Sequence, residues 1–278
     1  MSDTPRQSLA KWLVLAIFVA AFTFRAFSNY QGNNPRNDFH FSIIGDRTGG
    51  AQPQIFGRVW REVDLLRPDF VLNVGDTIEG GRDERAAAEW AEMKTLFQRY
   101  GRYPLYYTAG NHDIWSKASE DLYVKETGFK PYYSFNYQDA HFTVLDNSRT
   151  NGMPEDQLQF LEEDLKANAG KNPKIVVFHR DYWIRLLRAG DTSFPLHQMV
   201  KKYGVQHVIS GHGHRFVRII RDGVTYMEVG SSGGTMAAGW KRGEGFKEGW
   251  FYHHVWGRVK DGRVTFTVKE LDGTFGKG

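Results

Sequence analysis

Short apolar runs alternate with amphipathic stretches from residue 39 onward. Six of the runs have strand length and predict β-strands at residues 40–45, 70–74, 105–108, 141–146, 174–178 and 206–210. Between them, apolar positions recur at helical spacing around Val59, Trp90 and Leu161, and Pro154 marks the start of the third of these helices. This alternation predicts β-α-β units with helices covering the faces of the sheet.

The pattern changes after residue 210. Apolar runs at residues 216–220 and 224–229 flank a turn sequence, and those at 253–259 and 264–268 flank a second one at Asp261 and Gly262. Both pairs are typical of antiparallel hairpins. The whole pattern therefore predicts an α/β fold with one mixed sheet, or with two sheets packed face to face between helices.

The N-terminal segment has a different character. Arg6 and Lys11 precede an apolar run of 13 residues, 12–24, which as a helix reaches about 20 Å, against about 30 Å of bilayer hydrocarbon. Such a short run favours a signal peptide, and Ala26 and Ser28 supply small residues for cleavage, although membrane association through this run stays open. We expect a signal peptide or short membrane anchor at 1–28, a linker at 29–37 and the folded domain at 38–278. The domain is then periplasmic, extracellular or anchored outside the cytoplasm.

The composition excludes several classes of active site. The chain has no cysteine, which excludes disulfides, thiolate nucleophiles and cysteine-ligated metals. Any metal must therefore be held by oxygen and imidazole nitrogen. The net charge is only +4, and the basic residues are interspersed with acids, so the sequence carries no nucleic-acid signature. The zinc-peptidase motif H-E-x-x-H does not occur.

Five of the predicted strands end in residues with carboxylate, amide or imidazole donors. In α/β sheets, ligands bind at the carboxyl ends of the strands. A single Asp at such a place is usually a turn former or helix cap, and a single His is usually structural. Five in succession are improbable by chance. The series is Gly45 and Asp46, Gly75 and Asp76, Gly110-Asn111-His112-Asp113, His179, and Gly211-His212-Gly213-His214.

This series resembles the motifs of the calcineurin-like metallophosphoesterases, which are D-x-H, G-D, G-N-H-D/E, a lone His and G-H-x-H. The resemblance extends from Phe39 to about Gly230. It implies a four-layer α/β/β/α sandwich, with two mixed β-sheets flanked by helices. It also implies two divalent metal ions (Mn, Fe or Zn) at one edge and a small-molecule phosphate ester as substrate.

The resemblance assigns roles to individual residues. His112 would act as general acid or leaving-group stabiliser, and Asp113 would orient its ring. The reaction implied is hydrolysis of a phosphomonoester or phosphodiester by a hydroxide that bridges the metals. The first metal would be bound by Asp46, Asp76 and His214, and the second by Asp76, Asn111, His179 and His212.

The first motif departs from the family pattern, because Thr48 stands where the family has His. A hydroxyl is a poorer ligand than imidazole, so we expect the first metal site to be weak. Arg47 would either clamp a metal-bound phosphate as part of the catalytic site or point outward to a surface acid. A non-catalytic binding domain is the alternative function. The four motif histidines favour the enzyme.

Two further segments have open interpretations. Residues 180–185 bring basic and aromatic side chains next to His179, and they either cover a substrate or form a packed short helix. Residues 230–234, Gly-Ser-Ser-Gly-Gly, either line a phosphate with backbone N–H groups or form a flexible turn.

Overall fold

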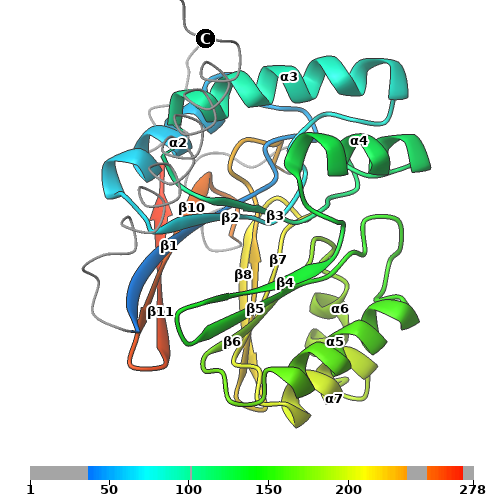
Figure 1. Ribbon diagram of the computed structural model, residues 1–278, viewed down its shortest axis with the longest axis vertical. Coiled ribbons are helices and arrows are strands. Elements are labelled where there is room, and N and C mark those ends of the chain that lie inside the picture. Colours follow the sequence, from blue (N-terminus) through cyan, green and yellow to red (C-terminus); the bar gives the residue numbers. More distant parts are fainter. Residues whose placement is uncertain (1–36, 101, 237–248, 272–278) are drawn as a thin grey trace, which may run out of the picture. The chain divides into compact units, whose positions relative to one another are not determined.

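The computed structural model describes residues 37–100, 102–236 and 249–271 of the 278-residue chain (Figure 1). The expected targeting segment, 1–28, and all of the expected linker except Asn37 lie outside the described residues. Within the described ranges, no helix is long and apolar enough to cross a membrane.

The first sheet has five strands in the order β11-β10-β1-β2-β3. Strands β1 (Asp38–Ile44), β2 (Phe70–Asn73) and β3 (Leu105–Tyr107) are parallel. Strand β10 (His253–Lys260) runs antiparallel to β1, and β11 (Arg263–Glu270) forms the edge as its hairpin partner. The sheet is therefore mixed, and the predicted C-terminal hairpin is confirmed.

The second sheet has six strands in the order β4-β5-β6-β7-β9-β8. Strands β5, β6, β7 and β9 are parallel, whereas β4 and β8 are antiparallel to their neighbours. The strands are β4 (Tyr133–Tyr137), β5 (Ala140–Val144), β6 (Lys174–Val177), β7 (His207–Ser210), β8 (Phe216–Arg221) and β9 (Val224–Val229).

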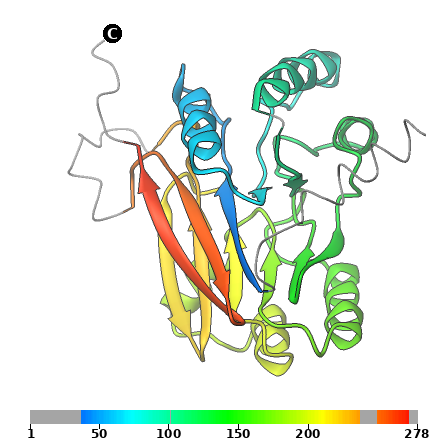
Figure 2. The same cartoon turned by 60° about the vertical axis from the view of Figure 1, so that its left-hand side comes forward.

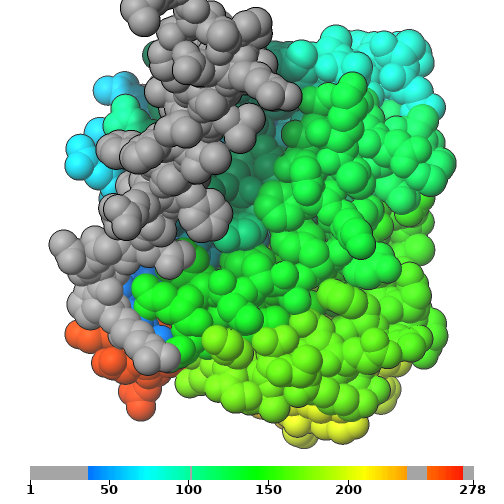
Figure 3. Space-filling model, viewed as in Figure 1, coloured from blue at the N-terminus to red at the C-terminus, as the bar shows by residue number. Residues whose placement is uncertain are grey.

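Three helices cover the outer face of each sheet (Figures 1 and 2). On the first sheet these are α2 (Ile55–Leu66), α3 (Asp83–Tyr100) and α4 (Lys117–Thr127). On the second they are α5 (Glu155–Ala167), α6 (Trp183–Arg188) and α7 (Pro195–Lys202). The predicted four-layer sandwich of two mixed sheets between helices is confirmed. Figure 3 shows the outer surface that β4, α4 and α5 form on one side.

Three apolar clusters separate these layers. The cluster between the sheets is aromatic at its centre, where the Phe41 ring stacks on Phe70 at 5.2 Å and meets Phe142 edge-on at 5.6 Å between ring centroids. Strands β2 and β6 are buried along their whole length because a helical layer covers one face and the other sheet covers the opposite face. Such strands consist of continuous apolar residues rather than alternating ones, which is why the sequence predicts them well.

Candidate metal centre

The carboxyl ends of five strands meet at one edge of the sandwich and bring together all six residues expected to bind metal. Asp46 follows β1, Asp76 follows β2, and Asn111 follows β3. His179 follows β6, while His212 and His214 follow β7. Residues separated by up to 168 positions in the sequence thus become neighbours because the parallel strands end at the same edge.

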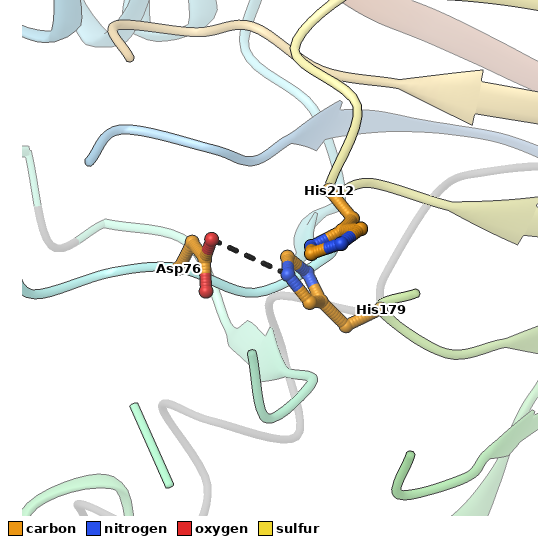
Figure 4. A group of neighbouring side chains, drawn as sticks. All are labelled: Asp76, His179 and His212. Atoms are coloured by element: carbon orange, nitrogen blue, oxygen red, sulfur yellow. Dashed lines mark ion pairs between the residues drawn. The ribbon is translucent and has the colours of Figure 1, made fainter. Parts of the chain in front are cut away.

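The six side chains form two donor groups that share one carboxylate. In the first group, Asp46, Asp76 and His214 offer donor atoms that all lie within 4.8 Å of one another. In the second, Asp76, His179 and His212 do the same, and Figure 4 shows these three side chains converging. Asn111 extends the second group, because its Oδ1 lies 3.1 Å from His179 Nε2. The geometry thus brings the residues of both expected ligand sets together around Asp76.

Four of these residues have a left-handed backbone conformation, which is uncommon outside glycine. The φ angles are 50° at Asp46, 58° at Asp76, 80° at His212 and 55° at His214. Each such residue costs on the order of 1–3 kcal/mol and persists only where its surroundings hold it. Backbone strain of this kind concentrates at functional sites. Here it turns the side chains that follow β1, β2 and β7 toward the shared edge.

Two glycines, Gly75 and Gly110, allow the loops that carry the donor residues to lie close together. A Cβ added at Gly110 would lie 2.2 Å from Asp76 Oδ1, and one added at Gly75 would lie 2.6 Å from His179 Nδ1. Gly75 also has a φ of 106°, which L-residues with side chains rarely adopt. Gly75 and Gly110 are therefore required by the geometry of the site.

The first donor group fits a divalent cation. Asp46 is fully buried, and its Oδ2 has no hydrogen-bond partner among the described residues. Burial raises the pKa of this carboxyl to about 7, and the neighbouring Asp76 charge adds to the rise. A bound divalent cation would favour the ionised carboxylate and supply the partner that Oδ2 lacks. The carboxylate and imidazole donors suit borderline metals such as Mn²⁺, Fe²⁺ and Zn²⁺.

The second donor group contains a buried ion pair. His179 Nε2 lies 3.3 Å from Asp76 Oδ2, and both side chains are buried. Burial disfavours both charges, yet their mutual attraction lowers the pKa of Asp76 and raises that of His179 to about 10. His179 Nδ1 is held by the carbonyl of Val74. Because a ligating imidazole must be neutral at its donor atom, metal binding here would release the Nε2 proton.

The ring of His112 is oriented by a residue that the sequence did not indicate. His112 Nδ1 bonds to the carbonyl of Glu79, and the His112 backbone N–H donates to Asp76 Oδ1 at 2.9 Å. The Glu79 carboxylate also accepts from the N–H of Ala51 at 2.8 Å, which ties the loop after β1 to the loop after β2. No motif marks Glu79, because its role depends on its carbonyl and on the course of the loop.

The expectation that Asp113 orients the His112 ring is wrong. The carboxylate of Asp113 is fully buried and instead accepts hydrogen bonds from the backbone N–H groups of Asp76, Thr77 and Gly110 at 2.8–2.9 Å, with Ile78 at 3.3 Å. Asp113 is thus a positioning residue that fixes the loop carrying Asp76.

Replacing Asp113 with alanine is expected to lower the free energy of unfolding by roughly 3–5 kcal/mol, because several buried amides lose their acceptor. Urea denaturation measures this change. The control is Asp121→Ala, which removes an exposed ion pair to Lys117 on α4 and costs less than about 0.5 kcal/mol. A loss at Asp113 no larger than that of the control would contradict the positioning role.

Arg47 adopts the second of its two expected arrangements. Its guanidinium pairs with the surface residue Glu92 at 3.1 Å and donates to the carbonyl of Thr77 at 3.3 Å. The predicted phosphate clamp is not formed in this structure, and it would require the guanidinium to leave Glu92. An arginine next to a ligand motif can form its ion pair with a neighbouring helix instead, and sequence spacing does not reveal that partner.

The segment at residues 230–234 is neither a flexible turn nor a phosphate loop. Ser231 is fully buried, and the backbone N–H groups are used internally: those of Ser232 and Gly234 donate to the carbonyls of Gly45 and Asp46. These two bonds, of 2.8 and 2.7 Å, brace the loop after β1. The segment therefore supports the backbone at Asp46, and these two amides donate to the protein and not to a ligand.

Three solved structures share this fold. A purple acid phosphatase from seeds of yellow lupin (Lupinus luteus) aligns with a TM-score of 0.64 at 16% identity, covering 85% of this chain and 52% of the lupin chain. This chain thus spans about half the length of that protein. A dimetal phosphatase from Danio rerio aligns with a TM-score of 0.58 at 11% identity, covering 84% and 96%. GAP50, the anchor in the inner membrane complex of Plasmodium, aligns with a TM-score of 0.55 at 16% identity, covering 85% and 90%.

The sequence itself matches the model of one protein family. No curated protein is significantly similar to the chain. The family model described as calcineurin-like phosphoesterase, however, matches residues 37–216 of the 278 residues. That range contains every residue of the two donor groups. The chain therefore belongs to the calcineurin-like phosphoesterase family.

Proposed function

We propose that the chain hydrolyses a phosphomonoester or phosphodiester at the two donor groups. The observation that carries this proposal is the sharing of Asp76 between two groups whose donor atoms lie within 4.8 Å. One cation would be held by Asp46, Asp76 and His214, and the other by Asp76, Asn111, His179 and His212. Two such cations, when bound, lower the pKa of coordinated water toward neutrality and stabilise the charge of the phosphoryl group.

His112 supplies the proton for the leaving oxygen in this proposal. Because the Glu79 carbonyl can only accept, His112 Nδ1 carries a proton and donates it to that carbonyl. The ring is thereby fixed, and Nε2 is the atom left to carry the proton that is transferred. The backbone N–H of His112 donates to Asp76 Oδ1 and so ties His112 to the carboxylate that both donor groups share. A histidine in this position contributes as general acid or by stabilising the charge on the leaving oxygen.

Hydrolysis of aryl phosphate mono- and diesters by the full chain tests the proposal. With Mn²⁺ supplied, we expect turnover of at least one of the two, loss of that turnover in excess EDTA, and recovery when Mn²⁺ is restored. Comparing phenyl phosphate with diphenyl phosphate assigns the ester class. A rate that EDTA does not change, or no hydrolysis of either ester, would overturn the proposal.

The two metal sites should differ in affinity. Thr48 is fully buried two residues after Asp46, where a hydroxyl replaces the expected imidazole, so the first site has one strong donor fewer than the second. After Mn²⁺ loading and mild dialysis, we expect about one metal ion per chain by elemental analysis. Two tightly retained ions per chain would contradict a weak first site.

The second candidate function is a non-catalytic binding domain. Thr48 favours it, since loss of a first-site donor is one way for such a site to lose activity. The fold similarity to GAP50, which is described as an anchor, does not distinguish between the two candidate functions. The hydrolysis assay separates the two candidates. Export from the cytoplasm is proposed from residues 12–24 alone and stays a prediction.

A further inference from the structure

A pocket of about 660 Å³ lies next to the second donor group, and His212 belongs to both. The pocket is strongly cationic. Among its lining residues, a single acid, Asp181, stands against four arginines. The arginines are Arg180, Arg185, Arg188 and Arg215.

Two of these arginines directly follow histidines of the donor groups. Arg180 comes after His179, and Arg215 comes after His214, so their backbones lie about 3.8 Å from those of the histidines. Among the described residues, Arg180 is held by neutral groups: its Nε donates to the carbonyl of Ser148, and its Nη1 donates to an amide oxygen, both at 3.0 Å. Its charge is therefore positioned in the pocket wall without being neutralised.

Arg215 is the exception, because it pairs with a buried acid. Its Nε lies 3.2 Å from Glu228 Oε2, and its guanidinium lies over the Trp250 ring at 5.4 Å. These contacts fix the side chain at the wall of the pocket. Within the described residues, the other three arginines of the pocket have no ion pair of this kind.

The remaining two arginines lie on α6. Arg185 and Arg188 are three residues apart and thus on one face of the helix, and both are exposed. Within the described part of the chain, neither makes an ion pair. Like charges at this spacing destabilise a helix slightly. A bound anion would turn this repulsion into attraction.

The size of the pocket sets the kind of anion. Its volume lies within the range of about 300–1,000 Å³ that is typical of small-molecule sites, and it is larger than one phosphate group requires. Tyr182 and Ile184 add an aromatic and an apolar surface to the wall. Guanidinium groups bind phosphate through paired hydrogen bonds. The combination suits a molecule of sugar size that carries its own phosphate.

We infer that this pocket binds a second phosphate group of the substrate, so that the enzyme acts on phosphate esters whose remaining part is itself phosphorylated. The inference rests on the proposed function for the hydrolysed ester. The ester to be cleaved lies at the donor groups, and the second phosphate lies among Arg180, Arg185 and Arg188. His212 forms the wall between the two positions.

The test compares a hexose bisphosphate with the corresponding hexose monophosphate, using the full chain with Mn²⁺. We expect the bisphosphate to have a kcat/KM at least about 10-fold higher, well above the twofold that two equivalent esters explain, because charged hydrogen bonds contribute this much. In the double variant Arg185→Gln/Arg188→Gln, this ratio should fall by about 10-fold, mainly through KM. The control Arg263→Gln, an exposed arginine on β11, should leave both rates unchanged.

Two results overturn the inference. One is a ratio near two or below in the natural chain, and the other is the same ratio in the double variant as in the natural chain. If neither ester is hydrolysed, the proposed function fails and the pocket is still tested by calorimetric titration of the bisphosphate. The double variant should then bind it about 10-fold more weakly. Equal affinity would overturn the pocket assignment.

Discussion

Replacing Asp76 with asparagine is expected to reduce kcat/KM for an aryl phosphate by about 10³-fold. Asp76 is the one residue that both donor groups contain. Asparagine keeps the shape and the acceptor for the His112 N–H but removes the charge that would hold two cations. Metal ions contribute several kcal/mol to such reactions, and each 1.36 kcal/mol corresponds to a tenfold change in rate. Initial rates at saturating Mn²⁺ measure the effect.

The matched control is Asp121→Asn, which removes an exposed carboxylate on α4 that belongs to neither donor group. It should retain full activity. Circular dichroism melting shows whether the Asp76 variant is folded at the assay temperature. A folded Asp76→Asn protein with at least a tenth of the natural kcat/KM would contradict the assignment of Asp76 as the shared ligand.

Replacing His112 with alanine is expected to reduce kcat by 10²- to 10⁴-fold for phenyl phosphate, the range typical of general acid catalysis. The loss should be clearly smaller for p-nitrophenyl phosphate, because a phenolate of low basicity leaves without a proton. His112 is not in either donor group, so metal content per chain should stay the same. Parallel rate measurements with the two esters provide the comparison.

His40→Ala serves as the control for this variant. His40 lies on β1 and stacks on Trp256 of β10 at 5.4 Å between ring centroids, whereas the site lies beyond the carboxyl end of β1. The control should leave both rates within about twofold of the natural chain. Equal losses for the two esters in the His112 variant would rule out proton donation to the leaving group and leave only a positioning role.

The sequence predicts those parts of the fold in which local pattern and burial agree. Strands β2 and β6 are buried along their whole length and β1 and β7 along most of theirs, and a motif follows each of the four. Strand β4 (Tyr133–Tyr137) escaped prediction because polar Ser134 and Asn136 interrupt its apolar residues. Helices α4 and α7 also escaped, since α4 is mostly polar and α7 is short.

The candidate site likewise has a part that the sequence predicts and a part that it does not. Its donor residues are predictable because they follow strands in a recognisable order, and the structure brings all six together. The supporting contacts are not. Asp113 binds backbone amides rather than the neighbouring ring, and Glu79 acts partly through its carbonyl. Arg47 finds Glu92 on α3. These partners depend on the path of loops in space, which sequence spacing does not determine.

The most direct test of the metal centre is the anomalous scattering of manganese in crystals of the full chain grown with Mn²⁺. We expect a strong peak among Asp76, His179 and His212 and a weaker one among Asp46, Asp76 and His214, with Asp76 contacting both. The absence of manganese from both groups, in crystals where the ion is bound elsewhere on the protein, would contradict it.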